Sequence, residues 1–363
     1  MTTAINAIYR GSVTYTSGSG TTPTAINLGG TIVTANSIVS MTIRSNDAAT
    51  RARRHYWTYD LTTTTIAFTR NESSSATTLT IEWEVIEFDT GVTVQRGNET
   101  FGTSSATHDI TITSVTTGQA FSTIVGMTTT FSAIPYKYVD ITSATNIRVT
   151  ADGVLSGTNI DSWQVIEFDS DVDVQRGLST SSGGTSKTSR TQSITSIDLS
   201  RSFAVHCGMT PPSGTTGRPT QSLGFNSATE LQITSLNFGT TNENTTSWAA
   251  IELPSGSTVE SGSVSVTNTN TTPTTQPNWT TALSNGSLLY GAYQTNVRKI
   301  TAADSNPNSF MFAISLDSPE DSLTVQRDGT ALEFTLEWFA IDWPVAVVGG
   351  FKPYFAYQTN RII

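Results

Sequence analysis

The sequence has very little cysteine and histidine, and it has no long apolar run. A single cysteine, Cys207, excludes an intrachain disulfide framework, and the three histidines, His55, His108 and His206, are scattered along the chain. This spacing favours neither a zinc site nor a Ser-His-Asp triad, so we expect no metal, no cofactor and no enzymatic activity. His206 and Cys207 point to opposite faces of a predicted strand, which favours a buried thiol and a half-buried imidazole. Since no segment has the 18 or so apolar residues of a membrane-spanning helix, we expect no membrane insertion.

Charge is also scarce and unbalanced. Asp, Glu, Lys and Arg together make up 13% of the residues, and the formal net charge is -10 at pH 7. Because nucleic-acid binding requires a basic surface, this balance predicts that nucleic acid is not a partner. One basic cluster interrupts the acidic background and consists of Arg44, Arg51, Arg53, Arg54 and His55. This cluster either docks on an acidic partner surface or binds an anion, or it is a plain solvated loop.

Segments with helical apolar spacing are also absent. Thr suits pleated strands, and Ser, Gly and Asn suit turns, so the polar residues that dominate this chain favour strands and turns. Regular alternation of Val, Ile, Phe and Trp between the polar runs argues against disorder. The composition therefore predicts an all-β protein.

What the chain does contain is a tryptophan motif that occurs four times. The tryptophans lie 80, 85 and 90 residues apart, a period too long for a solenoid turn and suited to a small β-domain. The motif reads Trp83-Glu84-Val85-Ile86-Glu87-Phe88, Trp163-Gln164-Val165-Ile166-Glu167-Phe168, Trp248-Ala249-Ala250-Ile251-Glu252-Leu253 and Trp338-Phe339-Ala340-Ile341-Asp342-Trp343.

A second motif comes after each of the first three tryptophan motifs and opens the next repeat. It reads Val94-Gln95-Arg96-Gly97, Val174-Gln175-Arg176-Gly177 and, without arginine, Val259-Glu260-Ser261-Gly262. Only Asp89–Thr93 and Asp169–Asp173 connect the first two tryptophan motifs to Val94 and Val174, so we expect tight joints that hold neighbouring repeats rigidly.

These repeats predict four tandem antiparallel β-sandwich modules of about 80–90 residues, followed by a short apolar C-terminal tail. The predicted boundaries are 1–92, 93–172, 173–257 and 258–345 for modules one to four, and 346–363 for the tail. Because so apolar a tail is costly in water, we expect it to pack on module four or on a partner subunit.

Each tryptophan motif also carries an acid, at Glu87, Glu167, Glu252 or Asp342. One interpretation is that these carboxylates form a ligand-binding site that is repeated for multivalency. The interpretation that we favour is that they form an ion pair or a hydrogen bond with Arg96 or Arg176 and so fix the joint between modules. Asp169, Asp171 and Asp173 alternate, so on a strand they would share one face, and such an oxygen-rich cluster can bind Ca²⁺. The equivalent joint after module one has only Asp89, so we favour a solvated turn. The predicted structural repeat positions are Trp83, Glu87, Arg96, Trp163, Glu167, Arg176, Trp248, Glu252, Trp338 and Asp342.

The order of these motifs resembles that of H-type lectin domains, six-stranded antiparallel sandwiches that begin with Val-Gln-x-Gly and close on x-Trp-x-x-Ile-Glu. The matching residues are Val94–Gly97 with Trp163–Glu167, and Val174–Gly177 with Trp248–Glu252. The resemblance implies a homo-oligomer, with a trimer favoured, and a sugar held at a subunit interface by the loop before the last strand. In this chain those loops are 71–75, 152–157 and 237–244.

Tandem Ser/Thr-rich β-modules of this kind also resemble structural proteins of tailed bacteriophages. Residues 1–6 lack the basic and apolar regions of a secretory signal, so we expect a protein made in a cytoplasm and located in the virion. The sequence therefore favours a non-enzymatic virion protein, namely a surface fibre, collar or head-decoration component whose partners are other virion proteins. The alternative is a carbohydrate-binding receptor-binding protein or adhesin that contacts a host surface glycan. A glycan depolymerase ranks third.

Overall fold

The computed structural model describes residues 3–16, 24–45, 57–70, 78–101, 105–129, 136–154, 158–180, 189–210, 220–236, 244–266, 274–275, 286–287, 312–316, 323–327, 334–343 and 355–362. Regular structure in these ranges is β-strand, apart from two short 3₁₀ segments, η1 (Thr34–Asn36) and η3 (Leu199–Arg201). The sheets are small and antiparallel, as β-sandwich modules require, and the predicted all-β fold is confirmed. No helix among the described residues is long and apolar enough to cross a membrane.

Six strands with one connectivity occur four times along the chain. In each module the sixth strand pairs with the first and the third, and these three strands form the first sheet. The fifth strand pairs with the second and the fourth to form the second sheet. Module one contains β1 (Ala4–Tyr15), β2 (Thr24–Asn27), β3 (Ser37–Ser45), β4 (Trp57–Leu61), β5 (Thr65–Arg70) and β6 (Leu79–Thr90), and module two contains β7 (Val92–Phe101), β8 (Thr107–Thr111), β9 (Ala120–Thr129), β10 (Lys137–Ser143), β11 (Asn146–Ala151) and β12 (Asn159–Phe168). Module three contains β13 (Asp173–Thr180), β14 (Ser189–Ser193), β15 (Ser202–Thr210), β16 (Thr220–Ser227), β17 (Glu230–Leu236) and β18 (Thr245–Glu252). Module four contains β19 (Thr258–Val266), β20 (Thr274–Thr275), β21 (Gly286–Ser287), β22 (Phe312–Leu316), β23 (Leu323–Arg327) and β24 (Phe334–Asp342).

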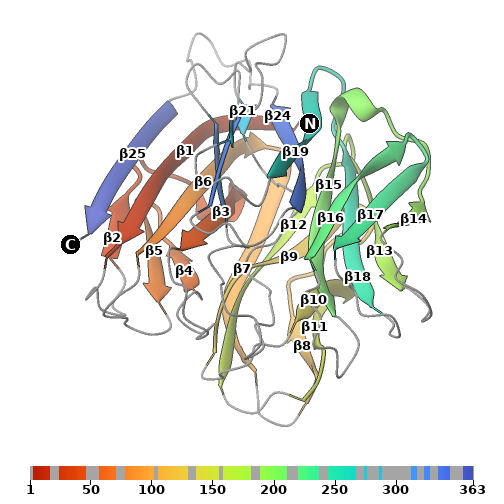
Figure 1. Cartoon of the computed structure of the whole chain (residues 1–363), viewed down its shortest axis with the longest axis horizontal. Helices are drawn as coiled ribbons and strands as arrows, with labels where there is room; N and C mark the ends of the chain where they lie inside the picture. Colours follow the sequence, from red (N-terminus) through yellow and green to blue (C-terminus); the bar gives the residue numbers. More distant parts are fainter. Residues whose placement is uncertain are drawn as a thin grey trace.

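The four modules form a closed ring. The fourth strand of each module packs on the first sheet of the next: β4 contacts β9 and β12, β10 contacts β15 and β18, and β16 contacts β24. Strand β22 of module four in turn contacts β3 and β6 of module one. In Figure 1, module one lies at the left, module two at the bottom and module three at the right, with β19 and β24 of module four near the top.

A single apolar cluster joins all four modules at the centre of the ring. The last residues of the tryptophan motifs, Phe88, Phe168, Leu253 and Trp343, are all buried in it. The ring of Trp343 makes edge contacts with Phe88, at 5.0 Å between centroids, and with Phe203, at 6.3 Å. Because one large apolar side chain contributes about 2–3 kcal/mol when it is buried, these side chains favour closure of the ring.

The C-terminal segment extends module one. Strand β25 (Phe355–Ile362) pairs in parallel with β1, from Ile8 opposite Phe355 to Tyr15 opposite Ile362. The expectation that the tail packs on module four or on a partner subunit is therefore wrong for this strand. The reason is that within module one β1 pairs only with β6, so the N–H and C=O groups on its other side are open to a further strand. The rest of the tail, apart from this strand, lies outside the described residues.

Candidate functional site

The tryptophan and the glycine of the two motifs face each other across the first sheet of each module. The cross-strand pairs are Gly11 with Trp83, Gly97 with Trp163, Gly177 with Trp248, and Gly262 with Trp338. A Cβ on Gly177 would lie 3.1 Å from Cζ2 of Trp248, so the glycine leaves the space that the indole fills. The motif thus places a buried indole against the flat backbone of an edge strand.

The glutamine of the second motif holds a neighbouring segment by two hydrogen bonds. Gln175 Nε2 donates to the carbonyl of Thr195 at 3.1 Å, and its Oε1 accepts from the Thr195 amide at 2.6 Å. Gln95 makes the same pair of bonds with Thr113, at 2.9 and 2.7 Å. The glutamine therefore fixes the segment that comes after the second strand of its own module.

The arginine of the same motif reaches back to the preceding module. Arg176 Nη1 donates to Asp140 Oδ1 at 2.8 Å and to the carbonyl of Ile141 at 2.9 Å, while its Nε donates to the carbonyl of Thr117 at 3.2 Å. Burial raises the pKa of Asp140, and the charge of Arg176 opposes that shift. At the first joint, Arg96 donates to the carbonyl of Ser37.

The repeated acids do not pair with these arginines, so that interpretation is wrong. Glu87 accepts from the Val33 amide at 2.6 Å and from Asn6 Nδ2 at 2.8 Å, and Glu167 accepts from the Thr116 amide at 2.6 Å. Glu252 forms an ion pair with Arg201. In these three modules the carboxylate holds the loop before the third strand, because that loop carries unpaired donors close to the end of the sixth strand. Asp342 lies at the end of β24.

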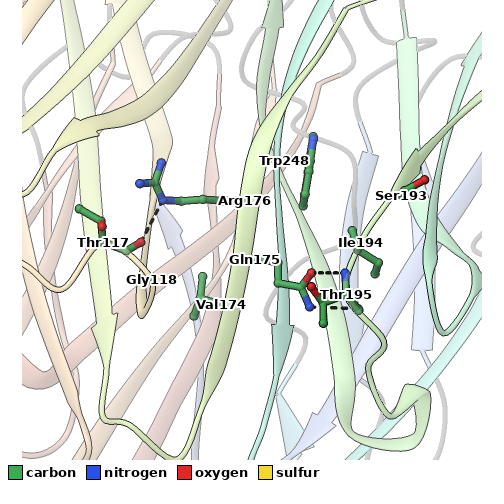
Figure 2. Close-up of a pocket in the computed structure, with 9 residues that line it drawn as sticks. All are labelled: Thr117, Gly118, Val174, Gln175, Arg176, Ser193, Ile194, Thr195 and Trp248. Atoms are coloured by element: carbon green, nitrogen blue, oxygen red, sulfur yellow. Dashed lines mark hydrogen bonds between the residues drawn. The ribbon is translucent and has the colours of Figure 1, made fainter.

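An open pocket of about 650 Å³ lies where module two meets module three. Figure 2 shows that its lining comes from both sides of the edge strand β13, with Arg176 beside Thr117 on one side and Gln175 beside Thr195 on the other. Its lining residues are Thr117, Gly118, Val174, Gln175, Arg176, Ser193, Ile194, Thr195 and Trp248.

The lining of this pocket offers groups that can bind a ligand. Arg176 is its charged side chain, and Nη2 of this guanidinium makes no hydrogen bond to the described residues. Hydroxyls of Thr117, Ser193 and Thr195 add polar groups, while Ile194 supplies apolar surface and Trp248 contributes only the small exposed part of a buried indole. A guanidinium and hydroxyls suit a polyhydroxylated or carboxylated ligand.

Several predicted residues lie apart from this pocket or outside the described residues. Arg44 lies half-buried on β3 near Glu82, whereas Arg51, Arg53, Arg54 and His55 are outside the described residues. The predicted sugar-binding loops at 71–75 and 237–244 are also outside, apart from Asn244, and 152–157 is described only to Val154. None of these described loop residues lines the pocket.

The hypothesis of a calcium site at the second joint gains no support from the described residues. Asp171 accepts from the amide of Thr3 at 2.9 Å, and no group of three or more potential ligands that could hold a metal ion occurs in the described ranges. The amide of Asp169 also donates to the carbonyl of Gly91 at 2.9 Å, so the two joints contact each other.

His206 and Cys207 have no catalytic geometry. Both are buried, and burial raises the pKa of the Cys207 thiol. Burial also lowers the pKa of His206 to about 4, so the ring is neutral at pH 7, with Nε2 3.0 Å from Gln221 Oε1. The buried thiol is as expected, whereas the imidazole is more deeply buried than expected.

Sequence reasoning missed Thr117, Gly118 and Ser193–Thr195 as pocket residues. The one available signal was the glutamine of Val-Gln-Arg-Gly. Its repetition indicated a specific contact but did not identify the residue that the glutamine contacts. Comparisons with protein-family models and with curated proteins find no match.

Proposed function

We propose that this chain is a non-enzymatic structural protein of a bacteriophage virion, used as a surface fibre, collar or head-decoration component. The observation that supports this most is the closure of four sandwiches into one ring around a shared apolar centre. Each module buries surface against two neighbours, which opposes local unfolding and therefore proteolysis. A protein exposed on a particle outside the cell benefits from that resistance.

The proposed assembly is a homo-oligomer, with a trimer favoured, bound to other virion proteins. Because each module already covers the joint faces of its neighbours, contacts between chains have to use other surface. The proposed docking residues are Arg44, Arg51, Arg53 and Arg54 of module one, since a basic cluster in an acidic chain favours an acidic partner.

Purified phage particles provide the test of this role. Antibodies to the recombinant chain should label the particle surface in electron microscopy, and the chain should be present in digests of particles purified by density gradient. Light scattering of the recombinant protein should give the mass of an oligomer. A stable monomer that is absent from particles would overturn the proposal.

The second candidate function is glycan binding at the pocket between modules two and three. The lining of the pocket supports it, because it combines the spare donors of Arg176 with the hydroxyls of Thr117, Ser193 and Thr195. In this proposal the ligand is a host surface glycan and the protein is a receptor-binding protein or adhesin.

A glycan array can separate the two candidates with a matched pair of variants. A Cβ on Gly118, in the pocket, or on Gly153, outside it, would meet no atom within 4 Å, so a side chain can start at either position without a clash. Gly118→Trp should abolish glycan binding and Gly153→Trp should preserve it. No binding by the unmodified protein, or equal binding by both variants, would reject glycan binding at this pocket.

A further inference from the structure

A buried ion pair crosses the interior of module two. Lys137 begins β10 in one sheet and Asp161 lies on β12 in the other, and both side chains have 0% exposure. Nζ of Lys137 lies 2.8 Å from Oδ1 and 2.8 Å from Oδ2 of Asp161. The carboxyl carbon between these oxygens is therefore in contact with the amine nitrogen. The ring of Phe101 covers the amine, with Nζ 4.4 Å from its centroid.

Two full charges at such a site are costly, since neither is solvated. Burial raises the pKa of Asp161, and the charge of Lys137 opposes that shift. Transfer of one proton from the ammonium to the carboxylate would give a neutral amine and a neutral acid, neither of which has to be solvated as an ion. The pair then holds an amine nitrogen beside a carboxyl carbon, so that a reaction between them is intramolecular.

The pair is specific to module two. Two residues before the tryptophan, where module two has Asp161, the other modules have Ile81, Thr246 and Leu336. The position that corresponds to Lys137 in module three is Gln221, whose Oε1 accepts from Thr246 at 2.6 Å. The fold thus forms with a neutral hydrogen bond at this place, and it does not require the charged pair.

We propose that Lys137 and Asp161 condense into an isopeptide bond once module two has folded. Nζ attacks Cγ, one C–N bond forms and one Cγ–O bond breaks. The departing hydroxyl takes the second amine proton and leaves as water, while one proton stays on the amide nitrogen. The ion pair becomes a neutral amide and water, and the step needs no oxidant, metal or cofactor.

The bond would join the two sheets of module two. Glu99 is opposite Asp161 on β7, and its side chain and that of His108 are 41% and 30% exposed, so solvent lies close to the pair on this side. Once it is formed, the cross-link closes the segment from Lys137 to Asp161 into a covalent loop. It would stabilise the module as a disulfide does, in a chain whose single cysteine cannot form an intrachain disulfide.

Intact-mass spectrometry of the purified full chain under denaturing conditions tests the proposal directly. The expected mass is about 18 Da below that of the sequence, which is the mass of one water. Digestion should give a branched peptide that links Lys137 to Asp161, and trypsin should not cut after Lys137. A folded protein that keeps the full sequence mass after prolonged incubation, or that is cut at Lys137, would overturn the proposal.

Two variants locate the loss of water. Lys137→Gln and Asp161→Thr introduce the residues that module three has at these positions, and each should restore the full mass. Because dehydration at Asp-Gly sequences such as Asp152-Gly153 also removes water, a mass deficit that persists in both variants would place the loss elsewhere and reject the bond. The branched peptide from the unmodified protein, or its absence, is decisive even if a variant fails to fold.

Discussion

A Cβ placed on Gly97 would lie 3.0 Å from Cζ2 of Trp163, across the pairing of β7 with β12. The same close approach of glycine to tryptophan recurs at Gly177 and Gly262, where the corresponding distances are 3.1 and 2.8 Å. Glycine in the second motif and tryptophan in the first therefore form one packing unit, although they are far apart in the sequence.

Gly97→Ala should lower the free energy of unfolding by about 1–3 kcal/mol, because the indole of Trp163 has to move out of a packed position. Urea denaturation measures this change. Gly118→Ala is the matched control, since its Cβ would meet no atom within 4 Å, and it should change stability by no more than about 0.5 kcal/mol. Equal stability of Gly97→Ala and the unmodified protein would contradict the packing argument.

Glu82 should make the protein less stable at pH 8 than at pH 4. Burial raises its pKa from 4.5 to about 7, although Arg44 and Ser12 oppose the shift. A raised folded-state pKa means that the stabilisation is complete below about pH 4.5 and is lost as the pH rises through about 7. Glu82→Gln keeps the neutral form, so it should avoid a loss of up to about 3 kcal/mol between pH 4 and 8.

Urea titrations of both proteins across this pH range give the comparison. The advantage of Glu82→Gln over the unmodified protein should increase with pH and level off above about pH 8. A constant difference at all pH values would show that Glu82 titrates normally in the folded protein.

His206 should have the opposite effect in acid. Burial lowers its pKa from 6.5 to about 4, so its contribution is complete above about pH 6.5 and is lost as the pH falls through about 4. His206→Gln removes the titrating group, and its unfolding free energy should therefore fall less steeply between pH 7 and 4. Parallel stability curves for the two proteins would contradict this prediction.

Removal of residues 355–363 should expose the outer edge of β1, because β25 covers that edge. An open edge strand promotes association between chains. The truncated protein should therefore elute as larger species in size-exclusion chromatography with light scattering, and a synthetic peptide of residues 355–363 should reverse the change. A truncated protein with the same mass distribution as the full chain would show that β25 does not protect this edge.

The strand content and the central tryptophan strands could be predicted, because both depend on local patterns. Alternation at Ser37–Ile43 and Leu79–Phe88 defines a buried face, and repetition of Trp83 at Trp163, Trp248 and Trp338 marks equivalent strands. These signals do not depend on where the modules lie relative to one another.

Partners that are distant in sequence could not be predicted. Arg176 was expected to contact a repeated glutamate, but it binds Asp140, whose position on β10 carries no motif. Parallel pairing of β25 with β1 joins the two ends of the chain, and no local pattern encodes that pairing. The pocket residues Thr117 and Gly118 lie in a polar turn with no distinguishing sequence signal.

A linear array of four modules has two terminal units, each with one uncovered face from which unfolding begins. The contact of β22 with β3 and β6 removes both, so no module can melt without breaking two interfaces at once. Heat or denaturant should therefore melt all four repeats together, in a single cooperative transition without stepwise fraying.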